Sequence, residues 1–174
     1  TARNRGVWKS PADVAIAGVA AAQTDVTADD QQILHPAGIN ALRHFEGRGL
    51  LVWGARTLSR RPEARYVGIR RLIGYLQASI IGGLGWAAFE PNDERLWQQV
   101  EQLLADFLVG LWRNGALAGD RADRAFFVRC DRTTMTQEQI DAGYLVAEIG
   151  IAPLRPAEFV FLRIGQWTAS RRNT

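Results

Sequence analysis

The sequence contains very little sulfur, histidine or lysine. Its 174 residues include one cysteine, one methionine and two histidines, and Lys9 is the only lysine among 21 basic residues. A single cysteine, Cys130, cannot form an internal disulfide, which fits a reducing compartment. One cysteine and two histidines nine residues apart match no usual spacing of metal ligands, so we expect no metal site and no cofactor.

Long hydrophobic runs are also missing. The apolar run at residues 14–22 has nine residues, whereas a membrane-spanning helix needs about 20. No charged segment followed by an apolar segment opens the chain as a secretion signal would. We therefore expect no direct membrane insertion. The chain does not begin with Met, and we expect Thr1 to be a processed or truncated start.

The composition is that of a folded domain. A chain of 174 residues that is 47% hydrophobic can bury a sizeable core and is too short to need a second one. We predict a single domain over residues 1–174, with an entry segment at 1–13, an α/β core at 14–156, and a C-terminal strand and arm at 157–174.

Arginine supplies nearly all of the positive charge, and the net charge is only +3. Residues 56–71 hold six arginines, without the interleaved aromatic residues or the motifs of nucleic-acid binders, so we expect no nucleic-acid partner. The planar guanidinium suits paired contacts between proteins, although a GC-rich genome also enriches arginine. The candidate subunit-contact residues here are Arg56, Arg60, Arg61 and Arg65.

Two helices can be predicted from hydrophobic spacing. In residues 69–80, apolar residues at offsets of three and four lie on one helical face, and Gly82 and Gly83 end it. Pro91, Asn92 and Asp93 then offer a helix start, followed by an apolar stripe that ends near residues 114–115. A short helix over 137–142, with Thr136 as its cap, is also expected.

The remaining apolar segments predict strands. They cover residues 14–19, 50–53, 86–89, 125–130, 145–152 and 158–167. Strands alternating with helices are typical of right-handed crossover units. The predicted fold is therefore α/β, with a mixed, partly parallel sheet flanked by helices and an extended C-terminal strand. Pro36 and Gly38 make a long helix in the first forty residues unlikely to form.

Two segments could carry chemistry. Cys130, followed by the polar loop 131–134, could serve a soluble α/β enzyme, with His35 or His44 as base. A cysteine at the end of an apolar strand is more typically inert, and Asp and Thr side chains commonly tie a turn together. The glycines at 82–85 follow a helix rather than a strand, so they do not form a dinucleotide-binding loop. We predict no catalytic residues.

The last strand does not suit an isolated domain, because both of its faces are apolar. An exposed edge strand of this kind would aggregate, so either it lies centrally in its own sheet or a neighbouring chain pairs with it. The candidate subunit-contact residues in this strand are Phe159, Val160, Phe161, Leu162, Arg163, Ile164 and Trp167.

Five blocks of sequence resemble one known family, and they occur in the family's order. They are GVWKSPAD (6–13), RGLLVWGARTL (48–58), FEPNDERLW (89–97), AFFVRCDRTTMT (125–136) and EIGIAPLRPAEFVFLRIGQWT (148–168). In these blocks the chain is similar to the C-terminal part of contractile tail sheath proteins, which form the outer sleeve of contractile phage tails and bacterial injection particles.

The resemblance implies a structural role without catalysis. Sheath copies would stack as a helical polymer around an inner tube, exchange terminal arms, meet baseplate and terminal cap proteins, and contract to drive the tube into a target. Assembly would be cytoplasmic, and the product a phage tail or a phage tail-like particle that can be released. The enzyme described above, and a small self-associating scaffold unrelated to tails, are the alternatives.

Overall fold

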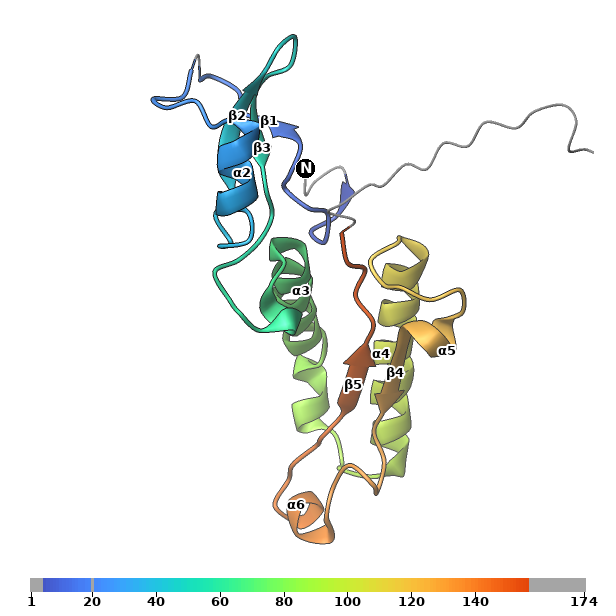
Figure 1. Cartoon of the computed structure of the whole chain (residues 1–174). Coiled ribbons are helices and arrows are strands. Elements are labelled where there is room, and N and C mark those ends of the chain that lie inside the picture. Colours follow the sequence, from blue (N-terminus) through green and yellow to red (C-terminus); the bar gives the residue numbers. More distant parts are fainter. Residues whose placement is uncertain (1–4, 20, 157–174) are drawn as a thin grey trace, which may run out of the picture.

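A computed structural model describes residues 5–19 and 21–156 of the chain. One end of the described part is a small antiparallel sheet with the strand order β1-β3-β2 (Figure 1). Its elements are β1 (Val14–Ala15), β2 (Ala41–Phe45) and β3 (Gly49–Trp53), accompanied by the helix α2 (Ala28–Leu34). Thr27 and Asp30 form a capping box at the start of α2, which is why so short a helix begins there.

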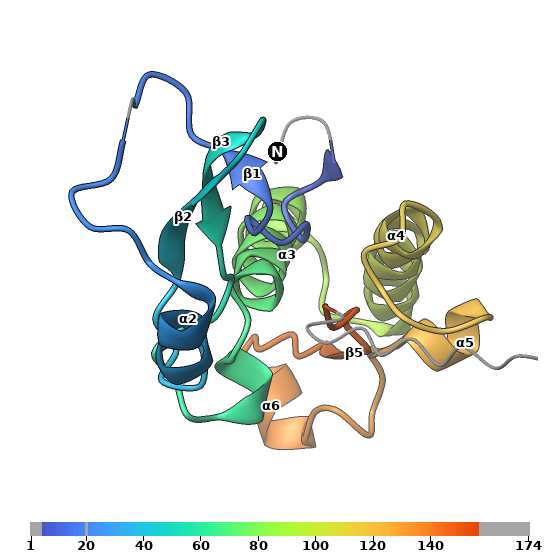
Figure 2. The same cartoon turned by 45° about the horizontal axis from the view of Figure 1, so that its top comes forward.

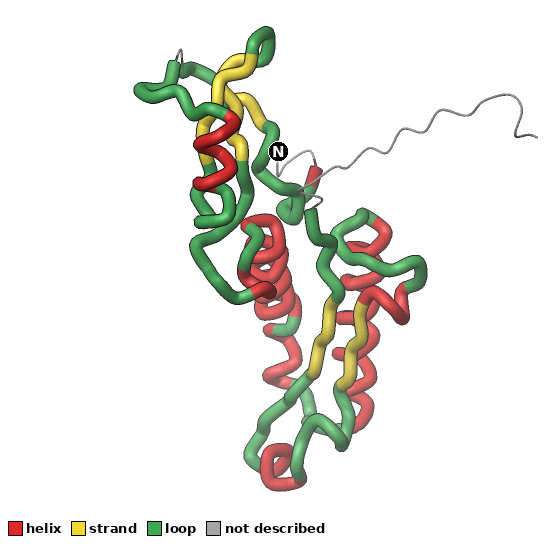
Figure 3. The backbone as a smooth tube through the Cα atoms, in the orientation of Figure 1, coloured by secondary structure: helices red, strands yellow, loops and turns green. Residues whose placement is uncertain are grey.

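Two long helices and a second sheet make up the rest. The helices are α3 (Val67–Gly83) and α4 (Glu94–Arg113), and β4 (Phe126–Arg129) pairs with β5 (Glu148–Ile151) in an antiparallel two-stranded sheet. Shorter pieces are the 3-10 helices η1 (Pro62–Ala64) and η2 (Gly85–Phe89), and the helices α5 (Ala122–Ala125) and α6 (Gln137–Asp141). Figure 2 shows α3 and α4 side by side, and Figure 3 shows β4 and β5 beside them.

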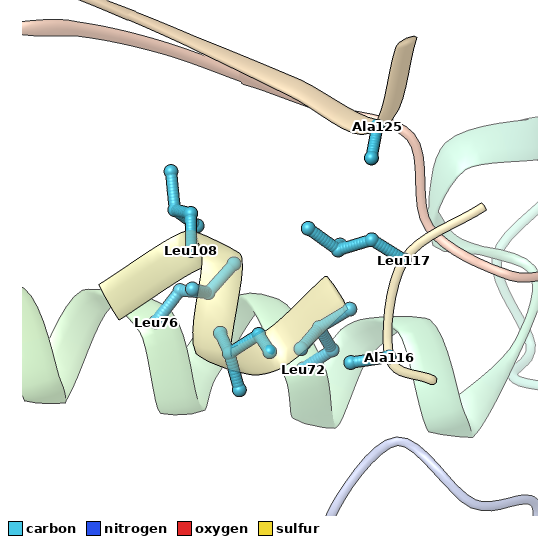
Figure 4. Close-up of a cluster of buried hydrophobic side chains, with 7 residues drawn as sticks. Leu72, Leu76, Leu108, Ala116, Leu117 and Ala125 are labelled. Atoms are coloured by element: carbon cyan, nitrogen blue, oxygen red, sulfur yellow. The ribbon is translucent and has the colours of Figure 1, made fainter. Parts of the chain in front are cut away.

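The main core lies where α3, α4 and the β4–β5 sheet meet. Leu72 and Leu76 of α3 pack with Leu108 and Leu111 of α4 and with Ala116, Leu117 and Ala125 (Figure 4). The N-terminal segment also reaches this core, because Trp8 packs against it. A Cβ atom at Gly68 would lie only 2.5 Å from the Trp8 carbonyl oxygen, so the absence of a side chain at Gly68 allows this approach.

A second cluster joins the start of α4 to the α6 region. Trp97 and Val100 of α4 are buried with Cys130 and Met135. The indole Nε1 of Trp97 donates to Asn92 Oδ1 at 2.8 Å, and Asn92 Nδ2 donates to the Tyr144 carbonyl oxygen at 2.9 Å. One amide side chain therefore holds the loop after α6 against the start of α4.

The expected crossover topology is wrong for the described strands, because all of their pairings are antiparallel. The crossover argument needed a strand at 86–89, and these residues form η2 instead. Three glycines precede or start this segment, and Leu84 and Ala87 turn inward to pack on the second cluster. The two helices thus follow each other without a strand between them. Residues 158–167 lie outside the described residues.

One helical stretch is long and apolar enough to cross a membrane by length and composition. It is Val67–Phe89, with 23 residues, whereas the apolar run at residues 14–22 gave no such signal. One such helix is weak evidence, because helices of soluble proteins pass the same test. Only 11% of its most apolar window is buried within the chain, so most of this apolar surface has no cover from the chain's own described residues.

Candidate assembly interface

The outer edge of β5 is open in the part of the chain that the structure describes. Ala152, just after β5, donates its N–H to the Ala125 carbonyl on the β4 side at 2.8 Å. Backbone groups alternate in direction along a strand, so those of Ile149 and Ile151 point away from β4. A two-stranded sheet is marginal by itself. This edge therefore offers hydrogen-bonding groups to a further strand.

An apolar groove runs along this open edge. It has a volume of about 520 Å³ and lies between α3 and β5. Ile69, Ile73 and Ile80 of α3 and Ile149 and Ile151 of β5 line it, together with further residues of α3, residues of η1 and residues that follow β5. The described chain leaves this region through Arg155 and Pro156, so the last described residues lie beside the groove. The groove can accept apolar side chains while the β5 edge accepts backbone hydrogen bonds.

The opposite face of the sheet is shaped by one close contact. A Cβ atom at Gly150 would lie 2.0 Å from the Phe127 ring, so the ring occupies the place of a side chain. Phe127 itself remains exposed on this face. The two faces of β5 therefore differ, with isoleucines facing the helices and the Phe127 ring covering Gly150.

The structure places the four predicted arginines in one loop, but in different environments. Arg60, Arg61 and Arg65 are exposed between β3 and α3, and Arg61 pairs with Glu63 at 3.4 Å. Arg56 is half-buried, and its Nη1 donates to the His35 carbonyl oxygen at 3.0 Å. Arg56 thus ties the loop to the end of α2, whereas the side chains of the other three lie at the surface.

The Cys130 segment has the features of a structural loop. Cys130 is 2% exposed, and burial, helped by Glu101 and Asp131, raises the pKa of its thiol to about 11. The histidines lie elsewhere, His35 at the end of α2 and His44 in β2. The structure therefore does not bring a base from either histidine to this thiol.

The polar loop after Cys130 binds its own backbone. Asp131 accepts a hydrogen bond from the Thr133 N–H at 2.7 Å, and hydrogen bonding by Thr133 lowers the pKa of Asp131. The Thr134 hydroxyl lies 2.8 Å from the carbonyl oxygens of both Asp131 and Val146. These side chains tie the turn together, as predicted for a structural loop.

The predicted contacts of the C-terminal strand, from Phe159 to Trp167, lie outside the described residues. The sequence argument missed the groove itself. Its signal was the width of the apolar surface on α3, where Leu72 enters the core, Ile69 and Ile73 line the groove, and Leu76 belongs to both. From the sequence, the apolar surface of α3 was interpreted as one helical face that packs against the core alone. It is wide enough to contact the core and to line the groove as well.

Comparisons with known proteins identify the family. Residues 59–166 match the model of the phage tail sheath C-terminal domain. A tail sheath protein of Vibrio phage KVP40 is 27% identical over 159 residues, which is 89% of this chain and 23% of that protein.

Solved structures agree. A chain in the anti-feeding prophage baseplate is 42% identical with a TM-score of 0.90, covering 96% of this chain and 47% of that one. A chain in the contracted sheath complex of PVC, an extracellular contractile injection system, is 40% identical with a TM-score of 0.90, covering 98% of this chain and 49% of that one.

The chain spans about a quarter of the curated relative and about half of these solved chains. The family match covers more than half of the chain, and it sets aside the scaffold unrelated to tails. The chain belongs to the phage tail sheath family, in which it corresponds to the C-terminal domain.

Proposed function

We propose that this chain is the C-terminal domain of a contractile sheath subunit, a structural protein that polymerises with copies of itself around an inner tube. The relatives include a chain of a helical sheath in a contracted state and a chain of a baseplate. By this proposal the subunit assembles in the cytoplasm, without inserting into a membrane. It then becomes part of a phage tail or phage tail-like particle, where it also meets baseplate and terminal cap proteins.

The open β5 edge above the isoleucine groove carries this proposal. The groove is apolar, and no strand among the described residues pairs with this edge, so the site suits an extended segment with apolar side chains. The segment 158–167 of this sequence has that character. We propose that this segment of one copy adds to the β5 edge of a neighbouring copy, with Phe159, Phe161 or their neighbours in the groove.

Register would be fixed by the two faces of the added strand. A slip of one residue would exchange them and turn Gln166 toward the groove in place of Phe159 and Phe161. Each fully buried Phe, Leu or Ile side chain would contribute roughly 1.5 to 3 kcal/mol. A few such side chains can offset the cost of association, which is about 4 kcal/mol or more.

The test is to end the full-length protein after Pro156 and compare it with the intact protein by electron microscopy and thermal unfolding. We expect the truncated protein to keep α3 and α4 folded but to form no tubes. A synthetic peptide of residues 157–168 should bind the truncated protein, and a scrambled peptide should not. Tubes formed without the segment would contradict the shared strand, and a truncated chain that fails to fold would show that the strand belongs to its own core.

A further inference from the structure

The end of the molecule beyond α3 exposes large apolar side chains. Phe89 is 90% exposed, and Tyr144 and Trp86 are exposed at the same end. Asn92 Nδ2 donates to the Tyr144 carbonyl oxygen, which brings the loop after α6 beside η2. We call Trp86, Phe89 and Tyr144 the tip patch. Such clusters of exposed apolar side chains mark contact surfaces.

A second exposed apolar pair lies before α3. Leu58 is 82% exposed, and Ile39 is exposed beside it, because a Cβ atom at Gly38 would lie 3.6 Å from the Leu58 Cα. We call Ile39 and Leu58 the linker patch. α3 separates the two patches, and its 17 residues at 1.5 Å each span about 25 Å. The two patches therefore cannot touch within one chain.

The charges around the two patches are opposite. Near the linker patch, the exposed residues Arg60, Arg61 and Arg65 outnumber Glu63. The end that holds the tip patch carries the exposed acids Glu90, Asp93, Glu138 and Asp141, which outnumber the exposed Arg95, while Arg132 is already paired with Glu94 at 3.0 Å. The linker patch is therefore an apolar centre with a basic rim, and the tip patch is an apolar centre with an acidic rim. The two surfaces are complementary.

From these observations we infer that the tip patch of one copy docks on the linker patch of the next. A contact between two different surfaces of identical chains is heterologous, and it generates an open helical filament when its rotation does not close into a ring. The inference rests on the proposed sheath function and adds a contact separate from the β5 edge. It also gives a partner surface to the exposed arginines of the 56–65 loop.

Disulfide trapping tests this contact in the full-length protein. Cys130 is buried, with a thiol that stays protonated, so the introduced cysteines dominate the reaction. We expect L58C together with F89C to give a ladder of covalent oligomers when assembled tubes are oxidised, because a disulfide requires Cβ atoms about 4 Å apart. The matched control is L58C with L103C, since Leu103 is exposed on α4 away from both patches.

Charge reversal provides an independent measurement. We expect R60E alone, or E90R alone, to slow assembly roughly tenfold at low salt, and the double reversal to restore the rate. If the wild type forms tubes but L58C with F89C gives no ladder and the double reversal does not restore the rate, this contact is overturned while the sheath function stays intact. If F89C no longer binds the inner tube and L58C with F89C gives no ladder, the tip patch contacts the tube instead. This result would also overturn the inferred contact. A wild-type protein that forms no tubes would instead refute the sheath function, and with it this inference.

Discussion

A single polar substitution in the isoleucine groove should separate folding from assembly. Ile73 of α3 lines the groove and is half-buried in the chain alone. An added strand would complete its burial, which contributes about 1 kcal/mol, since full burial of such a side chain contributes roughly 1.5 to 3 kcal/mol. Ile73→Asn removes this gain and places an amide without partners against an apolar strand, at a cost of about 1 to 3 kcal/mol.

The two effects together weaken each contact by about 2 to 4 kcal/mol, or roughly 30-fold to 1000-fold in the association constant. We expect Ile73→Asn to form tubes only at much higher protein concentration, as measured by sedimentation and electron microscopy. Thermal unfolding should change little, because the amide remains accessible to water in the free chain.

Ala78→Asn is the matched control. It places the same residue in the same helix, at an exposed position that does not line the groove. Its helix-propensity cost is at least as large, because Ala is a better helix former than Ile. If Ile73→Asn folds normally and still assembles at the wild-type concentration, the groove does not receive a strand and the reasoning fails.

Three further predictions concern the subunit itself. Leu108→Ala should lower the free energy of unfolding by about 2 to 5 kcal/mol in a denaturant titration, since Leu108 is fully buried between α3 and α4. Asn92→Ala should cost about 1 to 3 kcal/mol because it leaves the buried Trp97 indole N–H without its acceptor, whereas Asn92→Asp keeps an acceptor and should cost less. Cys130→Ala should leave assembly intact at a cost of roughly 1 to 2 kcal/mol. The native thiol should resist alkylation at pH 8 until the chain unfolds, because its raised pKa of about 11 leaves little thiolate.

The helices were predictable because their signals are local. The apolar stripe of α4 starts at Asp93, whose side chain accepts a hydrogen bond from the Leu96 N–H at 3.0 Å. The capping box of Thr136 and Gln139 likewise fixes the start of α6. These are contacts between residues three positions apart, so a sequence pattern records them directly.

The errors arose where distant contacts decide the structure. Residues 86–89 have the apolar composition of a strand, but Leu84 and Ala87 pack on the second cluster and the segment becomes η2. β2 was missed because its alternation is weak, and its pairing with β3 stabilises it. The groove could not be seen either, since it depends on β5 lying across from α3.

The two proposed contacts differ in physical character, and this difference bears on how a sheath could change shape. Strand addition at β5 combines backbone pairing with buried isoleucines, so its register is fixed and salt affects it little. The tip contact has a rim of exposed charges, which salt screens within about 10 Å at 0.1 M. Raising the salt concentration should therefore weaken the Leu58–Phe89 contact before the β5 contact. A polymer with one contact of each kind could exchange its charged contacts while the shared strands keep neighbouring subunits joined.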